Sequence, residues 1–349
     1  MITPLQDNGS ARPLALTMGD PAGIGPELAL MAWASRTTAS LAPFCLYGCA
    51  QTLRARAKKI GVDVPVEAIA TSGEGARVFS HALPVIDMPV AETVVAGQPS
   101  AQNGAATIAT IERAVADVKS GVASAIVTNP IAKSVLYAAG FKHPGHTEFL
   151  AALANMHWPG AAHQPVMMLA SDDLKVVPLT IHVPLANVPG MITRELITTT
   201  VRITAEALRR DFGIAQPRIA IAGLNPHAGE DGTIGREEDD IIAPALNALR
   251  SDSVTLIGPL SADTMFHAAA RATSDAAICM YHDQALIPIK TLAFDKGVNV
   301  TLGLPFVRTS PDHGTAFGIA GRGTASVTSL IEALRLADRM VAARAKARV

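Results

Sequence analysis

The stretch from residue 14 to residue 27 reads Leu14-Ala15-Leu16-Thr17-Met18 and then Gly19-Asp20-Pro21-Ala22-Gly23-Ile24-Gly25-Pro26-Glu27. The first five residues form an apolar run of strand length, and the glycines and prolines after it turn the chain into a helix that we expect to open near Glu27. The same alternation continues along the chain. Further expected strands are Phe44–Gly48, Ser124–Val127, Lys175–Ile181, Arg218–Ala222 and Ala276–Tyr281, and expected helices include Gln51–Ile60 and Ala105–Lys119. Continuous apolar strands separated by helices are typical of a largely parallel sheet covered on both faces, so the sequence predicts an α/β fold.

The composition is that of a globular protein of two domains. With about 150 residues per domain, 349 residues favour two. A hydrophobic share of 49%, a charged share of 17% and a mean hydropathy of +0.29 exclude a disordered chain and a coiled coil. A boundary is signalled around residues 140–145, and a helix expected at Ser326–Ala345 returns to the first domain. We therefore expect residues 1–140 with about 310–349 in one α/β domain and residues 141–309 in the other.

Charge and targeting signals exclude several partners. The net charge of −1 gives no global attraction to nucleic acid or to an anionic membrane. No apolar run approaches the roughly 20 residues that span a bilayer. Residues 1–13 lack a basic region followed by an apolar stretch, so we expect a cytoplasmic protein. Three cysteines, Cys45, Cys49 and Cys279, form neither a disulfide framework nor a zinc pattern, and we interpret them as buried apolar side chains.

Three histidines stand just after expected strands. His182, His227 and His282 follow the runs Lys175–Ile181, Arg218–Ala222 and Ala276–Tyr281 respectively. The carboxyl ends of strands in an open α/β sheet face the ligand crevice, so these side chains can share one site although they are far apart in sequence. Three neutral imidazoles suit a divalent ion such as zinc or cobalt with open positions for a substrate. The alternative is that each histidine is only a satisfied hydrogen-bonding group.

Two aspartates accompany these histidines. Asp283 directly follows His282, and Asp263 lies in Ser261-Ala262-Asp263-Thr264. Ser261 could cap a following helix, with Asp263 favouring its N-terminal dipole. Alternatively, the two carboxylates orient the metal ligands or move a proton. The sequence leaves both interpretations open.

A second group of residues suits an anion. Gly145-His146-Thr147-Glu148-Phe149 opens a helix, where free backbone N–H groups favour a phosphate or carboxylate, although Thr147 could equally be a plain helix cap. Lys290, Asn299 and Arg308 interrupt apolar segments downstream. The two cations could bind a phosphorylated substrate, or they could be solvated ends at the surface.

The glycine-rich segments match no standard nucleotide motif. Gly19–Glu27 lacks G-x-G-x-x-G, and no G-x-x-x-x-G-K-[ST] occurs, so neither a standard Rossmann site nor a P-loop is supported. Asp312-His313-Gly314-Thr315-Ala316, followed by Gly321-Arg322-Gly323, forms another loop that we expect to be exposed before a helix.

Taken together, these segments resemble the 4-hydroxythreonine-4-phosphate dehydrogenase family of pyridoxal 5′-phosphate biosynthesis. The resemblance runs from Leu14 to about Leu334. It is carried by LTMGDPAGIGPE, VTNPIAK, GHTEFL, GLNPHAGEDGTIGREE, GPLSADTMF, YHDQALIPIK and GLPFVRTSPDHGTA. It implies two α/β/α domains like those of isocitrate and isopropylmalate dehydrogenases, with the active site in the cleft between them, and a homodimer with sites at the subunit interface.

The resemblance also implies roles for residues. His182, His227 and His282 correspond to ligands of one divalent metal (zinc, magnesium or cobalt), one of them given by the neighbouring subunit. His146, Thr147, Lys290, Asn299 and Arg308 fall on substrate-binding positions. The segment from His313 through Gly314, Thr315 and Ala316 is similar to the adenine-side cofactor loop of the wider β-decarboxylating dehydrogenases. Gly318 stands where that loop commonly carries an acid that could bind the adenosine ribose, which leaves NADP possible beside NAD.

The implied reaction is oxidation of the C3 hydroxyl of 4-phosphohydroxy-L-threonine by NAD, followed by loss of carbon dioxide to give 3-amino-2-oxopropyl phosphate. Lys290, Asp283 and Asp263, together with metal-bound water, are the candidates for the general base. Sister dehydrogenases acting on D-threonate or D-erythronate 4-phosphate, or on a dihydrodiol dicarboxylate, are the nearest alternatives. A transferase related to phosphate acetyltransferases and a non-catalytic metabolite-binding protein are the others.

Overall fold

The computed structural model describes residues 12–160, 162–249 and 253–347. The chain divides into two compact units. The first runs to residue 162 and resumes from 305 to 338, and the second runs from 163 to 304 and resumes at 339. This division differs from the boundaries expected from the sequence, because helix α6 (His146–His157) packs against α4 (Gly104–Ser120) and so belongs with the first unit.

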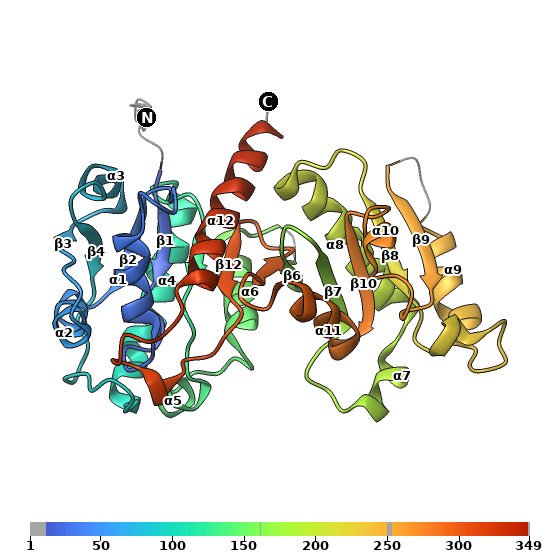
Figure 1. The fold of residues 1–349 in the computed structure, drawn as a ribbon, viewed down its shortest axis with the longest axis horizontal. Coiled ribbons are helices and arrows are strands. Elements are labelled where there is room, and N and C mark those ends of the chain that lie inside the picture. The colour runs from blue at the N-terminus through green and yellow to red at the C-terminus, as the bar shows by residue number, and fades with distance from the viewer. Residues whose placement is uncertain (1–11, 161, 250–252, 348–349) are drawn as a thin grey trace. The chain divides into compact units, whose positions relative to one another are not determined.

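The first unit is built on a parallel sheet (Figure 1). Its strand order is β3-β4-β2-β1-β5-β12, and neighbouring strands in this order are parallel. The strands are β1 (Leu14–Thr17), β2 (Phe44–Gly48), β3 (Val66–Ile69), β4 (Leu83–Asp87), β5 (Ile126–Thr128) and β12 (Arg308–Pro311). The helices are α1 (Gly25–Ala34), α2 (Ala50–Ile60), α3 (Gly75–Val78), α4, α5 (Lys133–Ala138), α6 and the start of α12 (Thr328–Lys346).

The second unit carries a mixed sheet in the order β11-β6-β7-β10-β8-β9. Its strands are β6 (Val166–Ala170), β7 (Lys175–Thr180), β8 (Arg218–Ala222), β9 (Thr255–Leu260), β10 (Ala276–Tyr281) and β11 (Val298–Leu302). Its helices are α7 (Val188–Met191), α8 (Arg194–Phe212), α9 (Ala243–Asn247), α10 (Ala268–Arg271) and α11 (His282–Ala293). Strands β7, β10, β8 and β9 are parallel, whereas β6 is antiparallel to both of its neighbours.

The predicted α/β class is confirmed, and the antiparallel strand β6 has a local cause. A tight turn joins β6 to β7, closed by the bond from Ser171 N to Leu174 O at 2.8 Å. Strands joined by so short a connection must run in opposite directions. The rest of the second sheet needs helical crossovers, and α8 and α11 both pack against β7.

Burial of the strands explains why these segments fold as they do. All of β1 and β2 is buried, and α4 packs on both strands. In the second unit a core cluster includes Val176, Ala222, Cys279 and Ile289. The cysteines are free and buried, as predicted, and burial raises the pKa of the Cys45 thiol to about 12. Every helix in the described part of the chain is too short or too polar to cross a membrane.

Candidate active site

The three histidines lie at the carboxyl edge of the second sheet. Strands β7, β10 and β8 are neighbours and parallel, and His182, His282 and His227 follow them in that order across the sheet. His282 is the first residue of α11, and the other two lie in the loops beyond their strands. The placement expected from the sequence is therefore observed.

Two of these imidazoles are in contact. The ring centroids of His182 and His282 are 5.8 Å apart. Nδ1 of His282 lies 2.7 Å from Oδ1 of Asp283, and an ionised carboxylate only accepts, so Nδ1 is the donor. The lone pair of the neutral ring is then on Nε2, the arrangement found in histidines that bind metals. Both rings line a cavity of about 290 Å³ together with Thr180 and Tyr281.

His227 sits in a loop with an unusual backbone. Its φ is 51°, and Ala228, Glu230 and Asp231 are also left-handed, as is His182 with φ 54°. This conformation is uncommon for residues other than glycine and is found preferentially where the surrounding structure holds a functional residue in place. No sequence pattern signalled it.

Glu238 holds the His227 loop and was missed by sequence reasoning. Its side chain is buried, and Oε1 accepts hydrogen bonds from Leu224 N at 2.7 Å and Asn225 N at 2.8 Å. Oε2 accepts from Asn225 Nδ2 at 2.9 Å. The sequence held one usable signal: Glu238 ends the glycine-rich segment GLNPHAGEDGTIGREE. A buried glutamate in such a segment must have hydrogen-bond partners, and the backbone N–H groups of the same segment are the nearest donors.

The hydrogen bond that Ser261 Oγ donates to the Asp263 carboxylate lowers the pKa of this carboxyl. Asp263 also lies near His227, close enough for the two side chains to interact electrostatically. The interpretation of Ser261 as a helix cap is wrong, because the next helix is α10 and its cap is His267. Within the described residues, no three His, Cys, Asp or Glu side chains of one chain form a metal-binding group.

Lys290 lies near His282. It is on α11, and both side chains line a shallow cavity of about 390 Å³ with Asp283. Asn299 is half-buried on β11. The second unit thus brings Lys290 to His282 and Asp283.

The first unit brings two predicted substrate residues together. Arg308 is 5% exposed at the start of β12, and its Nη2 donates to Thr128 Oγ1 at 2.8 Å. Burial lowers the Arg308 pKa to about 10, so the guanidinium stays charged at neutral pH. Burial first, and then the Arg308 charge, hold the His146 pKa well below its usual value, so this imidazole is neutral. Its Nε2 is buried without a hydrogen-bond partner among the described residues.

His146 stands at the start of α6, and the N-terminus of a helix favours an anion. His146 is the first helical residue and the cap is Gly145, so the interpretation of Thr147 as the cap is wrong. A Cβ on Gly145 would lie 2.7 Å from Glu148 Oε2 and 3.5 Å from Lys133 Nζ, so both a carboxylate and a further cation stand beside this helix start. Sequence reasoning missed Lys133, although it belongs to the quoted VTNPIAK segment.

Residues 313–316 form a loop with a strained end. His313 Nδ1 lies 3.0 Å from Gly314 O, so this nitrogen donates, and Nε2 is a buried acceptor that finds no partner in the described chain. Ala316 has a φ of 46°. An orphaned acceptor and a left-handed residue in one loop fit a segment that completes its hydrogen bonds with a ligand.

Comparisons with known proteins agree with this reading. The model of the pyridoxal phosphate biosynthetic protein PdxA matches residues 40–337. The chain is 56% identical over 345 residues to a 4-hydroxythreonine-4-phosphate dehydrogenase of Bradyrhizobium diazoefficiens, covering 97% of this chain and 99% of that protein.

Solved structures agree as well. The chain is similar to the crystal structure of a 4-hydroxythreonine-4-phosphate dehydrogenase from Klebsiella pneumoniae, with a TM-score of 0.85 at 38% identity, covering 95% of this chain and 100% of that one. A terephthalate 1,2-cis-dihydrodiol dehydrogenase from Burkholderia xenovorans is more distant, with a TM-score of 0.64 at 30% identity over 94% of this chain and 98% of that one. The chain therefore belongs to the family of the pyridoxal phosphate biosynthetic protein PdxA.

Proposed function

We propose that this protein oxidises 4-phosphohydroxy-L-threonine at C3 with NAD and a divalent metal, and that the product loses carbon dioxide to give 3-amino-2-oxopropyl phosphate. Membership of the family supports this reaction. The observation that carries it is the contact between His182 and His282 at the ends of adjacent parallel strands, with the Nε2 lone pair of His282 left for a metal.

His182, His227 and His282 would hold the metal, and residues 313–316 would bind NAD, with NADP as a possible substitute. When bound, the metal polarises the substrate hydroxyl and stabilises the charge left by decarboxylation, and NAD accepts the hydride. Asp283 fixes the tautomer of His282 through the bond at Nδ1. We propose a homodimer in the cytoplasm, in which the neighbouring subunit gives one of the three histidines.

Arg308, His146 and Thr147 would bind the phosphate. The buried guanidinium supplies a fixed positive charge, and the start of α6 supplies backbone N–H groups. Neutral His146 can donate one hydrogen bond without adding a second charge beside Arg308. Binding energy from this non-reacting group orients the carbinol carbon. Asn299 would contact the substrate as well.

We assign the proton transfer to Lys290. The hydrogen bond from Ser261 lowers the pKa of Asp263 and makes that carboxylate a weaker base. Asp283 is occupied with His282. Lys290 lines the same cavity as His282 and Asp283, which places its amine beside the proposed metal site.

The test is an assay that follows NADH absorbance with 4-phosphohydroxy-L-threonine as substrate. D-Threonate 4-phosphate, D-erythronate 4-phosphate and a dihydrodiol dicarboxylate are the competing substrates, the last suggested by the Burkholderia structure. We expect the first compound to give the highest kcat/KM. A higher value with any of the others would transfer the proposal to that sister reaction.

The role of the histidines is tested in the same assay. His282→Ala should abolish turnover while NADH binding is retained, and His81→Ala, at an exposed histidine paired with Glu67, should behave as the wild type. Equal turnover by His282→Ala in metal-supplemented buffer would refute the metal role of His282.

A further inference from the structure

The segment from Gly19 to Glu27 takes no part in the chemistry proposed above, yet it contains a buried charge. Glu27, on the first turn of α1, is 0% exposed, and its partner Arg56 on α2 is 3% exposed. The distance between Arg56 Nη1 and Glu27 Oε2 is 3.2 Å. A buried ion pair is an expensive way to stabilise a fold, because well-packed apolar side chains would serve as well or better. Its presence calls for another explanation.

The guanidinium of Arg56 fixes the backbone of the segment before α1. Nη1 donates to Gly23 O at 2.7 Å, and Nη2 donates to Pro21 O at 3.1 Å. Asp20 adds a local bond, because its Oδ1 accepts from Ala22 N at 2.9 Å. The side chain of Arg56 therefore ties the backbone at Pro21 and Gly23 to α2.

The carboxylate of Glu27 reaches a second loop. Its Oε2 also accepts a hydrogen bond from Gly321 N at 2.5 Å. Gly321 belongs to the 313–323 loop, which contains the residues that we assign to NAD. One carboxylate oxygen thus connects α1, α2 and the 313–323 loop, all within the first unit.

Backbone contacts bring the two loops together at further points. Ile24 N donates to Thr315 O at 3.0 Å. A Cβ on Gly23 would lie 3.0 Å from the same Thr315 oxygen, so the two backbones meet closely. Gly97, whose N–H donates to Ala22 O at 2.8 Å, would bring a Cβ within 2.9 Å of Phe317 O. The 313–323 loop therefore rests on residues 22–24 and 97.

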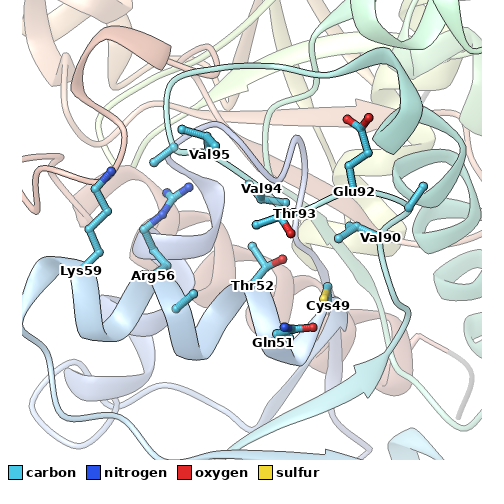
Figure 2. A pocket seen from close by; sticks show the side chains of 13 residues that line it. Cys49, Gln51, Thr52, Arg56, Lys59, Val90, Glu92, Thr93, Val94 and Val95 are labelled. Atoms are coloured by element: carbon cyan, nitrogen blue, oxygen red, sulfur yellow. The ribbon is translucent and has the colours of Figure 1, made fainter.

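A cavity lies beside this contact. In Figure 2, Arg56 and Lys59 on α2 lie across a hollow from the segment that carries Val94 and Val95. The cavity has a volume of about 380 Å³. Packed side chains do not fill the space between α2 and residues 90–96.

We propose that Glu27 and Arg56 are positioning residues for the nicotinamide nucleotide, acting through the 313–323 loop. The proposal rests on the proposed function only in taking residues 313–316 as the NAD-binding segment. The pair holds Gly321 and the carbonyls of Pro21 and Gly23 in one arrangement, and so fixes where the loop presents its backbone and His313. Neither side chain touches the cofactor in this proposal.

The decisive variant is the double substitution Glu27→Leu/Arg56→Met. Removing both charges leaves no uncompensated ion in the interior, so the double variant should still fold. Its melting temperature should fall, because Gly321 N and the carbonyls of Pro21 and Gly23 lose their partners. Hydrogen exchange of the peptide covering residues 313–323, measured without cofactor, should become at least tenfold faster, and the dissociation constant for NADH should rise at least tenfold.

The kinetic signature separates positioning from general stability. KM for NAD should rise at least tenfold in the double variant, while kcat at saturating NAD should stay within about threefold of the wild type. The single variants Glu27→Gln and Arg56→Lys, which keep part of the hydrogen bonding, should show intermediate values. The control is Asp211→Asn, which weakens a buried ion pair with Arg344 in the second unit and should leave the NADH dissociation constant unchanged.

Wild-type hydrogen exchange over residues 313–323 together with a wild-type KM for NAD in the folded double variant would overturn the proposal. A wild-type enzyme that fails to bind NADH would instead refute the proposed function. The exchange measurement would still decide whether the pair fixes the loop.

Discussion

Arg308 keeps its charge in a place where water hardly reaches it. It is 5% exposed, its pKa is lowered by burial, and the neutral ring of His146 lies within reach of its charge. A buried guanidinium of this kind can make strong, charge-assisted hydrogen bonds to an anion that reaches it. Single substitutions at Arg308 and His146 therefore test the proposed phosphate site.

Arg308→Met should lower kcat/KM for the phosphorylated substrate roughly 100-fold, a loss of about 3 kcal/mol that is typical of a removed buried charge contact. Steady-state kinetics measure the change, and circular dichroism checks that the variant is folded. Arg236→Met is the matched control, because Arg236 forms an exposed ion pair with Asp240. An equal effect in both variants would argue against a phosphate site at Arg308.

The His146 pKa predicts how stability depends on pH. Its folded-state pKa lies well below 6.5, so between these two values the unfolded chain binds a proton that the folded chain does not. The contribution of His146 to stability is therefore fully present above about pH 6.5 and is lost as pH falls below that value.

The corresponding measurement is the melting temperature at pH 7.5 and pH 5.5. The drop between the two should be smaller in His146→Gln than in the wild type, because glutamine does not titrate. An identical drop in both proteins would show that His146 is charged in the folded state or does not differ between the two states.

At the scale of elements, the loop after β8 depends on one carboxylate. Glu238→Ala would leave the N–H groups of Leu224 and Asn225 without their acceptor, at a cost of roughly 1–3 kcal/mol for each buried group. We expect a lower melting temperature and at least a tenfold loss of metal affinity, measured by metal content after dialysis.

Asp239→Asn is the matched control, since Asp239 is the exposed neighbour of Glu238. Full metal content in a folded Glu238→Ala protein would mean that the His227 loop does not need this support.

The elements show what local sequence can predict. The bounds of β8 and β10 agree with the apolar runs Arg218–Ala222 and Ala276–Tyr281, because burial on both faces of a parallel strand leaves a continuous apolar signal. The antiparallel direction of β6 was not predicted, because an apolar run carries no information about direction. The left-handed backbone of His227 was not predicted either, because contacts with the surrounding structure impose this conformation against the local preference of the residue.

At the scale of the whole molecule, the proposed metal site depends on which chain supplies each histidine. The sequence predicted that His182, His227 and His282 follow strands of one sheet, and they do. It could not predict the ring contact between His182 and His282, because that contact depends on loop conformation.

Mixed dimers test the proposed sharing of ligands between subunits. His227→Ala and His282→Ala proteins should each be inactive, and so should His182→Ala. If two of the mutated histidines serve one site from different chains, co-refolding the two variants restores one intact site per mixed dimer. We expect recovery of a substantial part of wild-type activity for at least one of the three pairings. No recovery in any pairing would mean that each site draws all three ligands from a single chain.

The backbone at His182 has a further consequence. The φ of 54° at His182 is favourable for glycine, whereas a residue with a Cβ loses roughly 1–2 kcal/mol of folded-state stability in this left-handed conformation. His182→Gly should thus withstand heat better than His182→Ala, and it would leave an opening shaped for a five-membered ring. Free imidazole added to the glycine protein should restore part of its turnover, whereas the alanine protein, more constrained at the same point, should respond less. The strained backbone at His182 would then allow its imidazole to be replaced by free imidazole from solution.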